Sequence, residues 1–377
     1  MLTCDLVRSV DLSARDESLW RAMTASNPAF GSPLLSPDFF HAVARVRDDA
    51  HVAVYRRNGE AVGFLAHHRR PNGLARPIGA PFSDYTALIT GPEAGFSIEV
   101  ALKTAGIRQL QVIGLIDPYD LFSDMNGAED TAFGFDFSQP DNVVSPKRQK
   151  KMRRREQKLI SDHGPLQFRV GDREAVTFER MLTWKRAQTH QTGISDFLAP
   201  KWIQALMHDL FALPPESPLQ GHMTSLYAGE RLVACKFGVR LGDYLHSWIS
   251  TYDPALRDYS PGLLFLTHAR EAMTEAGIRV YDMATGAPEY KGIYCNQIHK
   301  VYNGRVFGPT PQGQRDKALS QWRSRRIAQF GHRPAAALQR LGRRMDQIAT
   351  LELDTPQRIL GMAQALLSAP QRLKSSG

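Results

Sequence analysis

Short β-rich runs of apolar residues, separated by turn residues, dominate the hydrophobic pattern in the second half of the chain. Residues 222–228 and 231–240 are two such runs joined by a Gly-Glu turn, and a Gly-Asp turn leads into a third run over 244–251. Runs of this length bounded by glycine-containing turns are typical of antiparallel strands. The pattern therefore predicts a meander of three antiparallel strands.

A helix and a further strand follow this meander. The segment from about residue 262 to residue 275 has a helical pattern, Gly277 is placed to close it, and residues 278–283 look like a buried strand. A meander followed by a helix and a strand favours an α+β fold with a mixed sheet.

The chain repeats its own pattern. The sequence Ala-Gly-Ile-Arg occurs at 105–108 and again at 276–279, an offset of 171 residues. A hairpin pattern over 51–68 resembles the later one, and its short matches have offsets of 170 to 172 residues. Several matches at one shared offset indicate an internal repeat. We therefore expect two tandem copies of one mixed-sheet unit.

The repeat divides the chain into four predicted segments. Two domains cover 1–144 and 164–310, a basic linker helix covers 145–163, and a basic helical tail covers 311–377. The net charge is +9, yet residues 147–158 carry eight Lys and Arg against one Glu and the tail carries twelve against four, so the remainder is mildly acidic. Basic clusters attract phosphates and anionic membranes, or they form solvated helix faces.

The basic residues of the linker helix begin at its N-terminus, where positive charge is unfavourable. Ser145 is suited to cap this helix and Pro146 to occupy its first turn. Lysines and arginines then crowd a helix start, where the macrodipole disfavours cations. A phosphate partner would relieve this conflict, and the alternative is that Glu156 and the acidic body do so.

The tail has a helical pattern of its own. Apolar residues recur at roughly helical spacing from Leu319 to Phe330 among basic residues, and two more helices are expected over 335–349 and 356–368. Such a tail can pack on the body, pair with another subunit or lie on a membrane surface.

Several protein classes are disfavoured by what the sequence lacks. No stretch approaches 18 consecutive apolar residues, and the N-terminus turns acidic before any apolar core, unlike a spanning helix or a secretory signal. Cys4, Cys235 and Cys295 are far apart and odd in number, so neither a disulfide framework nor a zinc site is expected. Walker, GxGxxG, HExxH and GxSxG motifs are absent. We therefore expect a cytoplasmic protein that binds no metal.

The first candidate site is the turn that joins the third strand to the helix. Its residues are Tyr259, Ser260, Pro261 and Gly262. Serine is a good N-cap, proline a good first helical residue, and glycine leaves room where the first free amides point outward. A helix start of this kind binds anions such as a pyrophosphate, and the alternative is an ordinary capped helix.

The second candidate site is the loop after the last strand of the second copy. Asp282 leaves the strand, Gly286 lies in a Gly/Pro loop, and Tyr290 and Lys291 form an aromatic–lysine pair. Asp282 is suited to orient or deprotonate a nucleophile, and Lys291 to stabilise an oxyanion or hold a phosphate. The alternative is a surface turn with a structural ion pair.

Further polar residues are candidate ligand contacts because they share a face or a loop. They are Tyr244, His246, Trp248 and Ser250 on one strand face, Lys185, Gln188 and Thr192 on one helix face, and Asp84 and Tyr85 in a loop of the first copy. Asp84 is the carboxylate there best suited to grip an acceptor hydroxyl or amine. The strand face also suits half-buried packing against a helix.

The order of these motifs resembles a known family. Lys-Arg-x-Gln followed by Thr-Gly, then LHSW, YSPGLL, a strand aspartate and a Tyr-Lys pair look like the CelD/BcsL-like acetyltransferases, a branch of the GNAT superfamily described with cellulose and exopolysaccharide biosynthesis. The resemblance is best over 145–305, extends more weakly to 25–140 and leaves the tail uncovered. It implies two GNAT-like folds in tandem, as in the Fem-type peptidyltransferases, which agrees with the repeat.

The resemblance also implies a reaction. The Tyr290–Lys291 pair matches one associated in the family with stabilising the transferred acyl group, and the Ser260–Gly262 turn takes the place of a glycine-rich pyrophosphate loop whose usual glycines are missing here. The implied activity is transfer of an acyl group from acetyl-CoA or another acyl-CoA, a cosubstrate rather than a permanently bound cofactor, to an amine or hydroxyl of a sugar in exopolysaccharide or cell-envelope biosynthesis. Asp282 or His246 would assist proton removal.

The reaction that the resemblance implies assigns the candidate residues to two ligands, a donor and an acceptor. The donor would contact Tyr259, Ser260, Pro261, Gly262, Trp248, Gly286 and Tyr290. The acceptor would lie between the halves, near Asp84, Tyr85, Lys185 and Gln188. One donor site per chain is expected, because the first copy has no equivalent of the Ser-Pro-Gly turn.

Two other functions stay open at this point. One is Fem-like transfer of an aminoacyl group from charged tRNA to a cell-wall precursor, with the basic segment 147–158 gripping RNA phosphates. The other is a non-catalytic GNAT-like pair that binds membrane or polysaccharide machinery through its basic tail, at the inner face of the membrane. Outside the tRNA alternative no nucleic-acid partner is expected, and the oligomeric state is left open.

Overall fold

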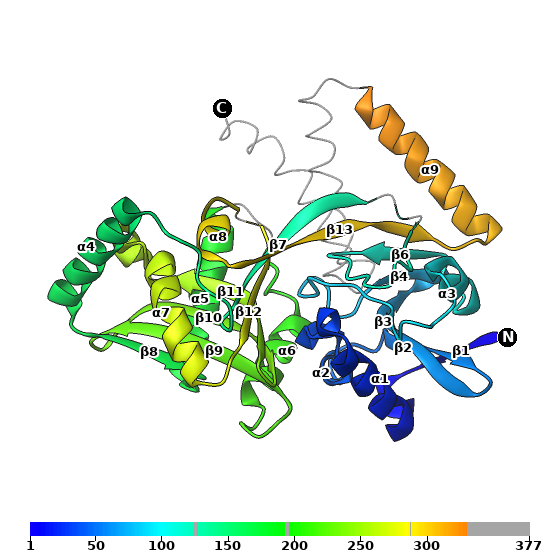
Figure 1. Cartoon of the computed structure of the whole chain (residues 1–377), viewed down its shortest axis with the longest axis horizontal. Helices are drawn as coiled ribbons and strands as arrows, with labels where there is room; N and C mark the ends of the chain where they lie inside the picture. Colours follow the sequence, from blue (N-terminus) through cyan, green and yellow to red (C-terminus); the bar gives the residue numbers. More distant parts are fainter. Residues whose placement is uncertain (124, 126, 193–195, 287, 330–377) are drawn as a thin grey trace.

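The computed structural model of the chain describes residues 1–123, 125, 127–192, 196–286 and 288–329. Within that part of the chain, thirteen strands form one continuous mixed sheet. Figure 1 shows the first half (blue to cyan) beside the second half (green to yellow), with long strands running from one to the other. The predicted tail helices over 335–349 and 356–368 lie outside the described residues.

The second half confirms the predicted meander, helix and strand. Its elements are β8 (Leu166–Val170), α5 (Ala175–Gln191), α6 (Lys201–Ala212), β9 (Leu219–Ala228), β10 (Arg231–Leu241), β11 (Tyr244–Tyr252), the 3-10 helix η5 (Pro254–Tyr259), α7 (Pro261–Glu275), β12 (Val280–Thr285), α8 (Pro288–Tyr294) and β13 (Gln297–Phe307). Strands β9, β10 and β11 pair antiparallel, and β12 returns parallel to β11 after α7.

The first half has the same element order in a shorter form. Its elements are β1 (Leu2–Val7), α1 (Ala14–Ser26), α2 (Pro37–Ala44), β2 (Ala50–Arg57), β3 (Glu60–Arg70), β4 (Leu74–Pro77), β5 (Ile89–Thr90), α3 (Ile98–Thr104), β6 (Gln109–Val112) and β7 (Ala128–Asp136). A β2–β3 hairpin comes first, and β6 then lies parallel to β4, as β12 does to β11. The tandem α+β architecture expected from the repeat is therefore present.

Two strands join the halves into one sheet. The strand order across the junction is β6-β13-β7-β12, so β7 of the first half pairs with β12 of the second, and β13 of the second half pairs with β6 of the first. All of these contacts are antiparallel, and β7 and β13 also pair with each other. Each half therefore completes its sheet with a strand from the other.

The predicted basic helix is α4 (Pro146–His163), and it packs against η5 and α7. Ser145 occupies its N-cap position but makes no side-chain cap hydrogen bond. Helix α9 (Pro311–Ala328) extends away from the sheet beyond β13 (Figure 1). Among the described residues, no helix is both long enough and apolar enough to cross a bilayer.

The sheet of the second half is covered differently on its two faces. On one face, residues such as Phe237 and Ile249 pack with α5, α6 and α2 in a core that extends into the first half. On the other face, α7 covers a second core that includes Phe265 and Tyr281. The face turned toward the first half is where the candidate site lies.

Candidate active site

The structure brings three of the predicted residues into one hydrogen-bonded chain. The Nε2 atom of His246 lies 2.8 Å from Oδ2 of Asp84, although the two residues are 162 positions apart in the sequence. The Nδ1 atom of the same ring lies 3.1 Å from Oδ2 of Asp282. Asp84 comes from the loop between β4 and β5. His246 and Asp282 are neighbours because they pair with each other in the parallel strands β11 and β12. The network therefore joins the two halves.

Burial and charge set the protonation states in this network. Burial lowers the pKa of His246, but the carboxylates of Asp282 and Asp84 outweigh it and raise the pKa to about 9. Burial raises the pKa of Asp282, and the facing His246 outweighs it and lowers the pKa to about 2. At pH 7 His246 is therefore an imidazolium that donates a hydrogen bond to a carboxylate on either side.

Only one member of the network is open to solvent. The side chains of His246 and Asp282 are 0% and 3% exposed, whereas that of Asp84 is 29% exposed. An imidazolium cannot accept a proton, and a substrate cannot reach a fully buried carboxylate. Of the three groups, Asp84 is the one that a ligand can touch.

Aromatic residues surround this open carboxylate. Tyr244 donates a hydrogen bond of 2.8 Å to Asp282, and the ring of Tyr85 lies edge-on to His246 at a centroid distance of 5.4 Å. Phe82 contacts Trp248 at 5.1 Å and Phe197 of the second half at 5.6 Å. Burial, with Asp282 and Asp84 nearby, raises the pKa of Tyr85 well above its ordinary value. The predicted strand face is thus an aromatic wall between the halves as far as Trp248, but a bulge in the pairing of β10 with β11 places Ile249 on this side, so the prediction for Ser250 is wrong.

The two central parallel strands part beside this network. Strands β11 and β12 pair only over Tyr244–His246 and Val280–Asp282, after which no pairing between them continues. Beyond that point three carbonyls at the end of β12 accept hydrogen bonds from Lys291, and the carbonyl of Ser250 in β11 accepts one from Lys185. The place where two strands stop pairing with each other is one where an extended amide-containing ligand can bind.

The Ser-Pro-Gly turn lies at the end of the molecule toward which these strands part. Helix α7 begins at Pro261, but Ser260 has φ +56° and its side chain caps no amide, so the predicted serine cap is wrong. Instead Oγ of Ser260 accepts a hydrogen bond of 2.5 Å from Arg155 of α4. A side chain at Gly262 would meet nothing within 4 Å. The helix start therefore faces open space with an arginine beside it.

Other α4 residues also pack against this turn. The ammonium of Lys158 lies 5.1 Å from the centroid of the Tyr259 ring, and the Tyr259 hydroxyl donates to Asp162 at 2.5 Å. The basic helix and the α7 turn, two features that were separate in the sequence, thus form one corner, to which Arg155 brings a positive charge, whereas Lys158 is paired with Asp162 at 2.8 Å. A phosphate group is the ligand that such a corner favours.

Lys291 is buried at the end of β12. Its Nζ donates to the carbonyl oxygens of Met283 at 2.6 Å, Thr285 at 2.7 Å and Ala284 at 3.4 Å. Three acceptors match the three N–H groups of an ammonium, so here Lys291 holds the β12 terminus, where Ala284 has φ +54°. Its role toward an oxyanion stays a prediction, and Gly286 and Tyr290 flank this terminus.

A second lysine near this strand is one that the sequence analysis missed. Lys236 of β10 is 5% exposed, with its ammonium 4.7 Å from the Phe265 ring centroid and 5.3 Å from that of Tyr281. Burial and the charge of Lys291 lower its pKa to about 7. The sequence could have indicated this residue, because it is a single lysine within an apolar stretch, Val-Ala-Cys-Lys-Phe.

The predicted acceptor residues on α5 also reach the site. Nζ of Lys185 donates to Oε1 of Gln188 at 3.2 Å and to the carbonyl of Ser250 at 3.3 Å. Burial lowers the pKa of this lysine, and Phe197 lies 6.0 Å from its ammonium. Thr192 is the C-cap of α5. Helix α5 thus contributes to the wall that contains Trp248.

Comparison with known proteins agrees with this geometry. Residues 146–292 match the family described as "Acetyltransferase (GNAT) domain". The match covers α4 and all elements through most of α8, including the charged corner, His246, Asp282 and Lys291. The second half therefore has a GNAT acetyltransferase fold. No curated protein sequence matches the chain.

Solved structures with similar folds share little sequence with the chain. FemX is 10% identical with a TM-score of 0.48, covering 80% of this chain and 96% of its own. The C-terminal domain of a putative lysylphosphatidylglycerol synthetase from Agrobacterium fabrum is 12% identical with a TM-score of 0.46, covering 82% and 95%. A fungal multi-domain protein with a GCN5-related glucosamine N-acetyltransferase region is 13% identical with a TM-score of 0.43, covering 81%, and the present chain spans 38% of that protein.

Proposed function

We propose that this protein is an acyltransferase that moves an acyl group from acyl-CoA to an amine or hydroxyl of a sugar in exopolysaccharide or cell-envelope biosynthesis. The observation that supports it most is the placement of two features around the parting of β11 and β12. A charged corner suited to a pyrophosphate lies at the α7 start, and the Asp84–His246–Asp282 network lies on the face toward the first half.

The donor would be held by groups already in place. Arg155 and the α7 start would bind the pyrophosphate, since a helix N-terminus and a guanidinium both favour phosphate oxygens. The amide-bearing arm of the donor would pair with the backbone of the parted strands. The thioester would then lie near the β12 terminus that Lys291 holds. Backbone amides would stabilise the oxyanion there, or Lys291 would do so by exchanging its weakest carbonyl acceptor, Ala284, for the oxyanion.

Proton removal in this proposal falls to Asp84. The acceptor would enter between Asp84, Tyr85 and the Lys185 side of α5, and its amine or hydroxyl would attack the thioester carbonyl. Its proton passes to the Asp84 carboxylate, and the CoA thiolate leaves and is protonated from solvent. His246 and Asp282 would orient Asp84. This assignment replaces the sequence-based choice between Asp282 and His246.

The experiment that tests the proposal is a calorimetric and thermal-shift titration with acetyl-CoA and longer acyl-CoAs. We expect saturable binding, one site per chain and an increase in melting temperature. Gly262→Ala is the matched variant: it should fold like the wild type, since its Cβ meets nothing, yet bind acyl-CoA more weakly because the Cβ occupies the phosphate position. If no CoA ester binds or stabilises the protein, the proposal is overturned.

One observation supports a second candidate function, transfer from aminoacyl-tRNA. Seven Lys and Arg side chains of α4 are exposed, namely Lys147, Arg148, Lys150, Lys151, Arg153, Arg154 and Lys158. A stripe of this kind binds RNA phosphates with a strong salt dependence. Tight, salt-sensitive binding of charged tRNA without any binding of acyl-CoA would favour this function over the first.

A further inference from the structure

A second cavity lies at the opposite end of α7 from the phosphate-binding turn. It has a volume of about 660 Å³, within the range of small-molecule sites, and its walls come from the ends of β8 and β10, the start of β9, the loop before β9 and Ala276 after α7. The fifteen residues of α7 separate it from Gly262 by about 22 Å. The cavity therefore does not belong to the candidate active site.

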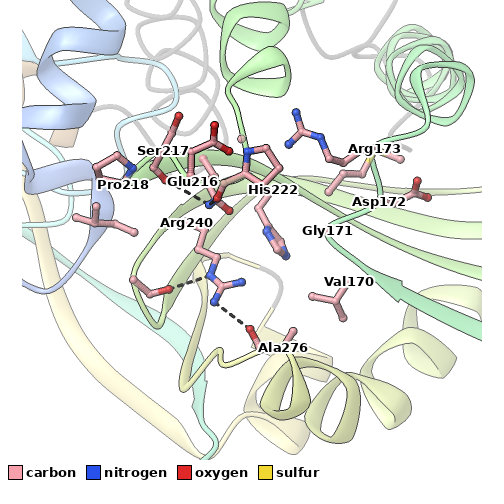
Figure 2. A pocket seen from close by; sticks show the side chains of 16 residues that line it. Val170, Gly171, Asp172, Arg173, Glu216, Ser217, Pro218, His222, Arg240 and Ala276 are labelled. Atoms are coloured by element: carbon pink, nitrogen blue, oxygen red, sulfur yellow. Dashed lines mark hydrogen bonds between the residues drawn. The ribbon is translucent and has the colours of Figure 1, made fainter.

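Two basic side chains lie together in this cavity. Figure 2 shows the guanidinium of Arg240 and the imidazole of His222 at its centre. His222 is 5% exposed, and its Nε2 has no hydrogen-bond partner among the described residues. Burial, and then the charge of Arg240, lower the pKa of His222 to about 3, so the ring is neutral at pH 7. A buried polar atom without a partner is costly unless a ligand or water satisfies it.

Arg240 is fixed in place but lacks a carboxylate partner. Its Nε donates to the carbonyl of Gly242 at 2.8 Å, and its Nη2 donates to the carbonyls of Ala276 at 2.9 Å and Gly277 at 3.5 Å; these three bonds leave Nη1 available. Burial lowers the pKa of Arg240, and the carboxylate that counteracts this, Asp243, is itself bound to Arg279 at 2.7 Å. The cation is thus preoriented and its charge is not neutralised by a direct ion pair in the described part of the chain.

Two acidic residues line the cavity, Asp172 and Glu216, and neither forms an ion pair with Arg240. Asp172 accepts hydrogen bonds from the amide of Glu174 and the hydroxyl of Tyr227, which occupy both of its oxygens. Glu216 is exposed on the loop at the rim. The rest of the lining is mixed, with Ser217 and Gln220 beside apolar residues such as Val170 and Leu241.

We propose that this cavity is a binding site for a small organic oxyanion, a carboxylate or phosphate on a polar body, which Arg240 and His222 grip together. The guanidinium Nη1 would donate to the oxyanion. The buried Nε2 of His222 would turn toward the cavity and donate a second hydrogen bond as the Nε2–H tautomer. The cavity is larger than an inorganic ion needs, so the polar body would lie against Ser217 and Gln220.

The test is calorimetry on the full chain with four probes: glucose 6-phosphate, glucuronate, glucose and inorganic phosphate. We expect at least one of the two sugar oxyanions to bind one site per chain and glucose not to bind. Binding of glucose 6-phosphate alone identifies a phosphate ligand, and binding of glucuronate alone a carboxylate ligand. If neither binds at millimolar concentration, or only inorganic phosphate does, the proposal is overturned.

Variants separate this cavity from other anion sites. Arg240→Gln and His222→Phe should each weaken binding at least tenfold, whereas Arg180→Gln on exposed α5 should not. Arg155→Gln should also leave the affinity for the sugar oxyanion unchanged. A loss of binding in this variant would place the anion at the α7 turn and contradict the proposal. Glu216→Gln should keep or tighten binding. Should Arg240→Gln not fold, His222→Phe and a shift of the His222 Nε2 resonance on ligand addition decide the question.

Discussion

At the scale of single residues, the proposed mechanism requires Asp84 to be the one open carboxylate of a buried network. His246 and Asp282 are held between it and the sheet, so their charges orient Asp84 without reaching a substrate themselves. A general base must be within hydrogen-bond reach of the proton it accepts, and of these three groups only Asp84 is exposed enough for a substrate to approach it.

Replacing Asp84 by Asn tests this assignment. The amide cannot accept a proton at neutral pH, so kcat for acyl transfer should fall about a hundredfold or more while the Kd for acyl-CoA stays within about twofold. Steady-state kinetics and calorimetry measure the two effects. Asp48→Asn, at an exposed aspartate of the same half, is the control. Equal activity of the two variants would refute the role of Asp84.

The His246 network also predicts a pH dependence of stability. The folded-state pKa of about 9 lies above the ordinary value of 6.5, so the stabilisation is complete below pH 6.5 and is lost as the pH rises to 9. The difference corresponds to about 3 kcal/mol at most. Urea unfolding at pH 6 and pH 9.5 should show a larger loss for the wild type than for His246→Gln. Parallel losses in both proteins would contradict the protonated network.

At the scale of elements, the proposed donor site depends on the packing of α4 on the α7 turn. Sequence patterns predicted both helices, yet not their contact, because the pairing of Arg155 with Ser260 spans 105 positions. The same limit explains the wrong serine cap: the local rule assumes an extended N-cap, whereas here Ser260 is left-handed and its hydroxyl faces α4.

A pair of neighbouring arginines on α4 tests this contact. Arg155→Gln should weaken acyl-CoA binding about tenfold, or about 1.4 kcal/mol, because it removes a preoriented guanidinium at the phosphate position. Arg154→Gln, one position away and exposed, should change binding less than twofold. Titration calorimetry at two salt concentrations measures both. If the two variants bind acyl-CoA equally well, the proposed contact of Arg155 with the pyrophosphate is wrong.

At the scale of the whole molecule, the sequence predicted the internal repeat but not the way in which its two copies join. Hairpins and the α7–β12 unit follow from local turn and strand signals, so they were predicted within a few residues. The crossing of β7 and β13 depends on pairing between distant strands, such as Asp136 with Val280, which no local pattern encodes. The division at residue 144 therefore stays a prediction about domains.

The exchanged strands predict that the halves unfold together. Because β7 completes the second half and β13 the first, neither half can lose its sheet without disrupting the other. Differential scanning calorimetry of the full chain should show one cooperative transition with equal calorimetric and van't Hoff enthalpies. Two resolved transitions would show that the halves are independent.

A crystal structure of the complex with CoA would show directly where the donor binds. We expect the pyrophosphate at the Gly262 amide beside Arg155, the pantetheine arm between the parted ends of β11 and β12, and the thiol end directed toward Asp84. A coenzyme bound elsewhere, or with its thiol on the far side of the sheet from Asp84, would contradict the proposed mechanism.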